Sequence, residues 1–286
     1  MKISIIIVLF LLGHIIGDFY LQWDKLAEDK SKSKGRFALH SSLYAISVGA
    51  VLFFTVNWSL ALLWVVLIAA GSHTLIDGFR VFIERLSNKS DENDKEPLRY
   101  VFLIDQLLHF LVIILLWFTW GHALTERGWV TDLSVDFLSV HPFTALLGLL
   151  CVIVPIGCLI GSGDIWDLKK MQPANEEKNA HKNSGKMIGY LERFIVFFLL
   201  LNGGFSSIGF VITAKAVIRF PEIGKAKDVR GEAEYYLIGT LLSVSFSFAV
   251  TMLLGSLRSI IVNISEFKPL EVSYRRLQKI RFPGVA

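Results

Sequence analysis

The sequence of 286 residues is poor in charge, proline and cysteine. Charged residues make up 19% of the chain, against about 25% in soluble globular proteins, and seven prolines leave long segments unbroken. The two cysteines, Cys151 and Cys158, lie two helical turns apart in one apolar run, which excludes a disulfide between them. These shortages exclude a disulfide-rich secreted domain and most soluble enzyme folds.

Motifs of the common enzyme classes are missing as well. The sequence contains no P-loop, no glycine-rich dinucleotide-binding fingerprint, no G-x-S-x-G nucleophile turn and no H-E-x-x-H zinc motif. The net charge of +4 is accounted for by basic loops beside a membrane. No nucleic-acid partner is therefore expected.

Apolar residues dominate what is present. Hydrophobic residues make up 53% of the chain, 22 of them are phenylalanines, and the mean hydropathy is +0.54. Runs of about 20 apolar residues are long enough to cross a bilayer as helices. We therefore expect an all-α protein, a polytopic transmembrane helical bundle of about seven or eight helices. The expected spans are 3–23, two within 41–79, 100–120, 143–160, 191–214 and 235–257.

The segment 191–214 has two interpretations, because Asn202, Gly203 and Gly204 interrupt it. It can form one span, or it can turn back as a hairpin. The chain as a whole divides into a four-helix membrane domain at 1–120, a fifth span with flanking loops at 121–189, a C-terminal membrane module at 190–260 and a basic tail at 261–286.

Lysine and arginine counts predict the orientation of the bundle. The loops after the first, third and fifth spans carry five each, whereas the loops after the second and fourth carry none and one, Arg127. The basic loops are therefore expected in the cytoplasm and the N-terminus outside. A single span at 191–214 places the tail inside, and a hairpin places it outside.

Ionisable residues within the first four spans form three pairs spaced i,i+4, a spacing that stacks two side chains on one helix face. No lysine, arginine or glutamate lies within these four spans. The orientation puts all three pairs, and His40 at the start of the second span, at similar depth near the cytoplasmic face. The pairs are His14 with Asp18, His73 with Asp77, and Asp105 with His109.

Imidazoles and carboxylates buried together favour a divalent metal site. We expect zinc, manganese or iron, as one or two ions. Asp105 is expected to be a ligand or the general base, and His40 a ligand or the acid. The expected ligands are His14, Asp18, His73, Asp77 and His109. Two other interpretations stay open. Each His–Asp pair can simply be hydrogen-bonded within itself, or the pairs can form a proton or ion relay.

Further polar residues are candidates for a supporting role. Gln22 lies two turns after His14 on the same face, and Asp164 lies at the inner end of the fifth span. Glu192 and Arg193 can be an ordinary interfacial ion pair or a phosphate contact. Lys215 and Arg219 end an apolar helix, where their side chains are expected to reach toward the interface.

The motifs resemble those of the DUF3307 family of bacterial integral membrane proteins. In the first 120 residues the resemblance is carried by His14-Ile-Ile-Gly-Asp18, Leu39-His40, His73-Thr-Leu-Ile-Asp77 and Asp105-Gln106-Leu-Leu-His109. It extends to Ile188–Arg193, Ala214–Phe220 and Ala233–Ser243. It implies a bacterial inner-membrane protein and adds weight to Lys215, Arg219, Glu234 and Thr240 as second-site residues. A looser similarity is to membrane-bound metal-dependent hydrolases and helical zinc phospholipases.

The sequence thus favours a metal-dependent membrane hydrolase that acts on a lipid or phosphate-containing substrate near the inner leaflet. The alternatives are a metal-ion or proton-coupled transporter, and a membrane sensor or partner-binding subunit with a structural metal. The lipid bilayer is the expected partner, and the sequence predicts no oligomeric state.

Overall fold

The computed structural model describes residues 5–87, 100–133, 141–162, 178–224 and 229–266. These residues form helices and no β-strand, apart from an isolated antiparallel bridge between Val56 and Glu126. The prediction of an all-α transmembrane bundle is confirmed. Asp164 lies outside the described residues.

Five helices make up the first half of the chain. They are α1 (Ile5–Ile15), α2 (Asp24–Asp29), α3 (Lys34–Thr55), α4 (Leu60–Ser87) and α5 (Val101–Trp120). A π-helical turn, η1 (Ile16–Tyr20), continues α1 and carries Asp18. Turns of this kind occur frequently at functional sites.

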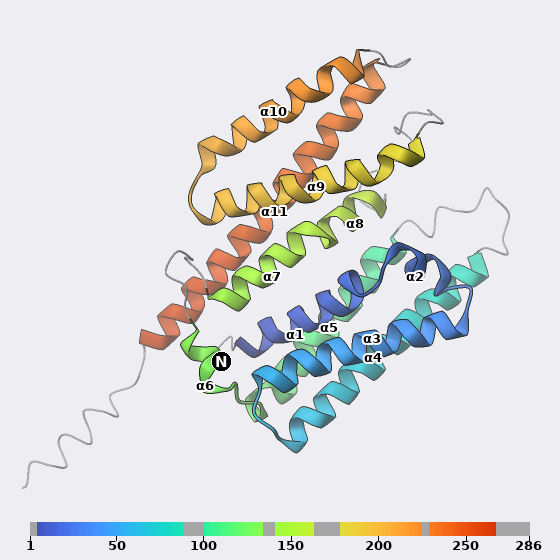
Figure 1. Cartoon of the computed structure of the whole chain (residues 1–286). Coiled ribbons are helices and arrows are strands. Elements are labelled where there is room, and N and C mark those ends of the chain that lie inside the picture. The colour runs from blue at the N-terminus through green and yellow to red at the C-terminus, as the bar shows by residue number, and fades with distance from the viewer. Residues whose placement is uncertain (1–4, 88–99, 134–140, 163–177, 225–228, 267–286) are drawn as a thin grey trace, which may run out of the picture.

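The second half begins with the short η4 (Gly121–Ala123) and α6 (Gly128–Asp132). The remaining helices are α7 (Pro142–Ile153), α8 (Pro155–Ser162), α9 (Lys178–Leu201), α10 (Phe205–Ile223) and α11 (Val229–Glu266). Figure 1 shows α1, α3, α4 and α5 side by side as one group, with α7 to α11 alongside and α2 at one end.

Five segments are long and apolar enough to cross a membrane: 34–55, 60–86, 101–123, 142–160 and 229–254. The apolar segment Ile5–Tyr20 is shorter. Many large apolar side chains face outward, among them Phe54, Leu75 and Phe210. Outward apolar side chains in this number suit a lipid surrounding rather than water. The exact number of crossings stays a prediction.

Two glycines bring α1 against α3. A Cβ at Gly13 would lie 2.9 Å from the Cα of Val48, and one at Gly17 would lie 3.0 Å from the Cα of Tyr44. The spacing Gly13-x-x-x-Gly17 is the small-residue pattern that lets membrane helices approach closely. Ser47 adds a hydrogen bond of 2.8 Å to the carbonyl of Gly13. His14 and Asp18 are thereby held beside α3.

Helices α7 and α8 together occupy the expected fifth span, but the helix is broken at Val154, directly before Pro155 begins α8. Proline has no N–H to donate to the preceding turn, and the last carbonyls of α7 have no partner within that helix. Tyr20 donates to the carbonyl of Leu150 at 2.9 Å, and Arg193 donates to that of Ile153 at 2.9 and 3.1 Å. Side chains from other helices therefore supply hydrogen bonds to these two carbonyls beside the break.

The segment 191–214 is a hairpin. Helix α9 ends at Leu201, Gly203 takes a left-handed conformation with φ of 73°, and α10 begins at Phe205. Glycine adopts this conformation without steric cost. As Figure 1 shows, α10 runs back alongside α9, and α11 then returns toward the end of the bundle where α6 and the N-terminus lie.

Candidate metal centre

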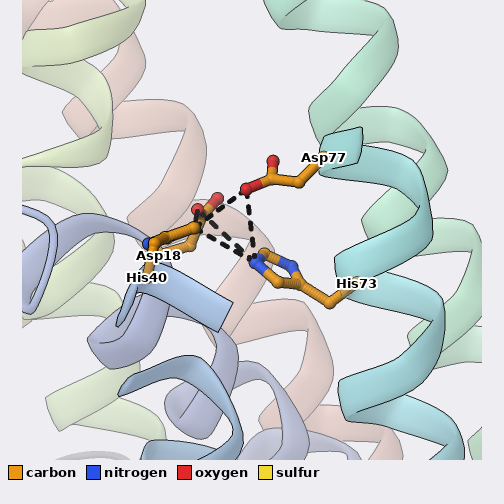
Figure 2. A group of neighbouring side chains, drawn as sticks. All are labelled: Asp18, His40, His73 and Asp77. Atoms are coloured by element: carbon orange, nitrogen blue, oxygen red, sulfur yellow. Dashed lines mark hydrogen bonds and ion pairs between the residues drawn. The ribbon is translucent and has the colours of Figure 1, made fainter. Parts of the chain in front are cut away.

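Three helical segments bring four buried ligand-type side chains together. Asp18 comes from η1, His40 from α3, and His73 and Asp77 from α4, and Figure 2 shows all four pointing into one space. The i,i+4 spacing of His73 and Asp77 puts both on one face of α4, as the sequence predicts. The α1–α3 contact at the two glycines then places Asp18 opposite them.

The distances among these side chains suit direct ligation of one ion. The Nε2 atoms of His40 and His73 are 3.3 Å apart, and Nε2 of His40 lies 2.9 Å from Oδ2 of Asp77 and 3.4 Å from Oδ1 of Asp18. Nε2 of His73 lies 3.8 and 4.0 Å from the same two oxygens. Tetrahedral ligands with bonds of about 2.0–2.1 Å are separated by about 3.3 Å, which lies within this range.

A second group shares Asp77. Asp77, Asp105 and His109 also offer ligand atoms within 4.8 Å of one another, and all three are buried. The Nδ1 atom of His109 lies 2.8 Å from the backbone carbonyl of Asp105. Since a carbonyl only accepts, Nδ1 carries the proton, and the lone pair of Nε2 is free for a ligand.

Buried polar atoms without a partner gather in this region. An uncompensated buried polar atom costs about 1–3 kcal/mol, so several together need a physical explanation. Among the described residues in and beside the two groups, the buried atoms without a hydrogen-bond partner are Nδ1 of His14, His40 and His73, Oδ1 of Asp77 and Asp105, and Nε2 of His109. A divalent ion coordinated here would give some of these atoms a partner, and the donor set fits such an ion.

The two groups, Asp18, His40, His73 and Asp77 and Asp77, Asp105 and His109, are together called the centre below. His14 is buried against this centre but belongs to neither group. Its ring centroid lies 5.3 Å from that of His109 and 6.0 Å from that of His73. His73 in turn stacks on Tyr44, with centroids 3.5 Å apart and rings 2° from parallel. The geometry thus places His40 among the closest potential ligands and His14 at the edge of the set. The assignment of individual ligands stays a prediction.

Two cations from outside the four expected spans also reach the centre. Lys30 is buried, and its Nζ lies 3.0 Å from Oδ2 of Asp77 and 3.2 Å from Oε1 of Gln22. The Nη1 atom of Arg80 lies 3.1 Å from Oδ2 of Asp105. Gln22 therefore supports Lys30 rather than reaching the carboxylates.

Gln106 was also missed as a contact of the centre. Its Nε2 donates to Oδ2 of Asp18 at 2.8 Å and to Oδ2 of Asp105 at 3.2 Å, which joins η1 to α5. Arg80 lies three residues after Asp77, so helical spacing could have revealed it. Lys30 follows the short α2 and has no periodic signal that points to Asp77.

The remaining candidates form a separate group in the C-terminal helices. Lys215 and Glu192 form an ion pair of 2.5 Å between α10 and α9, and both line a small pocket with Thr240 and Ser243 of α11. Glu192 and Arg193 are not paired with each other, because Arg193 is held by the carbonyl of Ile153. The Arg219 guanidinium lies over the Tyr236 ring at 5.1 Å, and Glu234 pairs with Arg230 at 2.8 Å.

The family described as "Protein of unknown function (DUF3307)" matches the chain over residues 6–155. The match covers more than half of the chain, from α1 to the first residue of α8, and includes every residue of the two groups above. It ends before the motifs that begin at Ile188. No curated protein and no solved structure matches the chain.

Proposed function

Because the chain belongs to the DUF3307 family, whose description states no activity, we propose its function from the centre itself. We propose that the protein is a metal-dependent membrane hydrolase with its centre near the cytoplasmic face of a bacterial inner membrane. Its substrate is a lipid or phosphate-containing molecule. The carrying observation is the convergence of Asp18, His40, His73 and Asp77 on a common point inside an apolar helical bundle.

The donor set favours zinc, manganese or iron, because imidazole with carboxylate suits these ions. One ion would be held by the first group, and Asp77, which belongs to both groups, can bridge to a second ion beside Asp105 and His109. Carboxylate bridging of this kind is compatible with two-metal hydrolytic sites.

A divalent ion bound here would acidify a water molecule and polarise a phosphoryl or acyl oxygen. The chain's own residues have separate tasks. Oδ2 of Asp105 is held by Arg80 and Gln106, while Oδ1 has no partner, which leaves Asp105 able to accept a proton from water. Tyr44 fixes the plane of the His73 ring, and Lys30 offsets the charge of Asp77.

Transport through the same centre is less well supported. Toward the α3–α4 turn the described helices fill the bundle with an apolar core that includes Phe10, Leu52, Val65 and Ile113. A continuous path for an ion across a membrane needs polar groups along its length. Among the described residues, the buried polar side chains in this part of the bundle are hydroxyls such as Ser47, Thr55 and Thr144 and none is ionisable, which favours chemistry at one face over passage between two.

Elemental analysis of the purified full-length protein tests the proposal. We expect about one to two transition-metal ions per chain and strong loss of metal in His73→Ala and Asp77→Ala. His122→Ala is the matched control, because His122 is exposed and lies outside both groups. The same preparations are assayed for release of phosphate or fatty acid from a bacterial lipid extract. Full activity in metal-free protein, or metal retained by both variants, would overturn the proposal.

A further inference from the structure

The centre reaches the molecular surface at one edge. The Lys30 side chain is 6% exposed, whereas the Arg80 side chain, which donates to Asp105, is 22% exposed. Gln106, which joins Asp18 to Asp105, is also only partly buried. A molecule that approaches the centre between η1 and α5 would therefore meet Arg80 and Gln106 before any of the carboxylates.

Aromatic rings flank the cation at this edge. The Arg80 guanidinium lies over the Phe102 ring at 5.6 Å, and Phe102 meets the edge of Phe19 at 6.4 Å. Phe19 directly follows Asp18, and Phe102 lies one turn before Asp105 on α5. Large apolar side chains nearby on α4 and α5, including Phe79 and Ile104, are exposed and suit a lipid surrounding. The edge thus combines an apolar approach with one cation, which Glu84 contacts at 3.0 Å from its own helix.

With two divalent ions bound, the charges of the centre would favour an anion. Asp18, Asp77, Asp105 and Glu84, which pairs with Arg80 at 3.0 Å, carry four negative charges, and Lys30 and Arg80 carry two positive charges, so the sum with neutral imidazoles is −2. One divalent ion would bring this sum to 0, and two would raise it to +2. An excess of positive charge in a low-dielectric setting is best offset by an anionic substrate. The Arg80 guanidinium already donates to Asp105 through Nη1 and to Glu84 through Nε, and its remaining N–H groups can donate to a phosphate oxygen.

We infer that the edge between η1 and α5 admits an amphiphile with a phosphate headgroup from the surrounding bilayer. Arg80 positions the phosphate, and Phe19 and Phe102 contact the first part of the apolar chain. This inference rests on the proposed function and names its substrate class. Arg80 is a positioning residue here, since it also holds the carboxylate of Asp105.

Binding of dodecyl phosphate tests the inference without requiring turnover. The metal-loaded full-length protein is placed in phosphatidylcholine nanodiscs, and calorimetric titrations are corrected with empty discs. We expect dodecyl phosphate to bind at least tenfold more tightly than inorganic phosphate. Arg80→Gln should weaken dodecyl phosphate binding at least tenfold, which corresponds to about 1.4 kcal/mol, and Arg80→Lys should restore part of it.

Two further variants separate headgroup from chain recognition. Phe102→Ala should weaken binding of dodecyl phosphate and leave binding of inorganic phosphate unchanged. Arg85→Gln is the matched control, because Arg85 is exposed on the same helix and donates to the carbonyl of Ser31 instead of the centre. It should bind both probes as the wild type does.

The outcomes distinguish this inference from the proposed function. Metal content is measured for every variant, and a wild type without metal overturns the proposed function itself. Equal binding of dodecyl phosphate by metal-loaded wild type and a metal-loaded Arg80→Gln variant overturns the role of Arg80. If dodecyl phosphate and inorganic phosphate bind equally tightly, and Phe102→Ala weakens neither, the ligand is a soluble phosphate ester. That result would overturn the inference that an amphiphile binds at this edge.

Discussion

At the scale of single residues, the centre depends on buried charges of opposite sign that neutralise each other. Lys30 is the clearest case, because a buried lysine needs a partner, and Asp77 provides one at 3.0 Å. Asp77 is also a proposed metal ligand. The ammonium and a divalent ion would therefore compete for the same carboxylate.

Lys30→Met tests this competition. We expect the variant to lower the thermal unfolding midpoint more in chelator than with bound zinc, because removing one partner of a buried pair typically costs about 3–5 kcal/mol. We also expect its apparent zinc affinity to rise, since no ammonium has to be displaced. Lys32→Met, at an exposed lysine two residues away, is the control and should change neither quantity. An equal loss of stability with and without zinc would contradict the competition.

At the scale of elements, the position of α1 against α3 decides whether Asp18 can face His40. The methyl group of Gly13→Ala would meet the backbone of Val48 at 2.9 Å, so the two helices must separate. We expect loss of bound metal together with a lower unfolding midpoint. Gly71→Ala is the control, because a Cβ at Gly71 meets nothing within 4 Å. Metal content at the wild-type level in Gly13→Ala would show that this contact does not position the centre.

A second prediction at this scale concerns the break between α7 and α8. Arg193→Met removes both hydrogen bonds to the part-buried carbonyl of Ile153, and loss of such a bond costs about 0.5–1.5 kcal/mol. We expect a lower unfolding midpoint in detergent and unchanged metal content, since Arg193 does not contact the centre. Arg230→Met, at a largely exposed arginine of α11, serves as the control for loss of a cation. Loss of metal in Arg193→Met would show that the break and the centre are coupled.

At the scale of the whole molecule, the α9–α10 hairpin decides the sidedness of the chain's end. Figure 1 places the last turn of α11 at the end of the bundle where α6 and the N-terminus lie, opposite α2. We expect a reporter fused after residue 286 to lie on the same side of the membrane as a His122→Cys label and opposite a Lys32→Cys label. Both native cysteines are first replaced by alanine. A reporter on the side of Lys32 would contradict the hairpin.

The same labels test the orientation predicted from the lysine and arginine counts. If the basic loops are cytoplasmic, Lys32→Cys is protected from an impermeant reagent in intact cells, and His122→Cys reacts. The reverse pattern would place the centre at the outer face and remove the inner-leaflet substrate from the proposal.

The boundaries of the four expected regions of the chain, 1–120, 121–189, 190–260 and 261–286, stay predictions as well.

The sequence by itself determined the apolar helices and the faces on which His73, Asp77, Asp105 and His109 lie. Both follow from local periodicity, because a helix of 3.6 residues per turn fixes which side chains share a face. The break before Pro155 and the hairpin at Asn202–Gly204 are also marked in the sequence, although only the structure shows a break in the fifth span and a turn rather than a continuous helix at 202–204.

Only the tertiary structure decided which faces meet and which long side chains reach into the space between them. Lys30, Arg80 and Gln106 contact the centre because helix packing brings Asp77, Asp105 and Asp18 within reach of flexible side chains from other segments. The pairing of Arg193 with a backbone carbonyl is of the same kind. Such contacts join residues far apart in the chain and leave no periodic pattern, so they follow from the packing of the helices and not from the spacing within them.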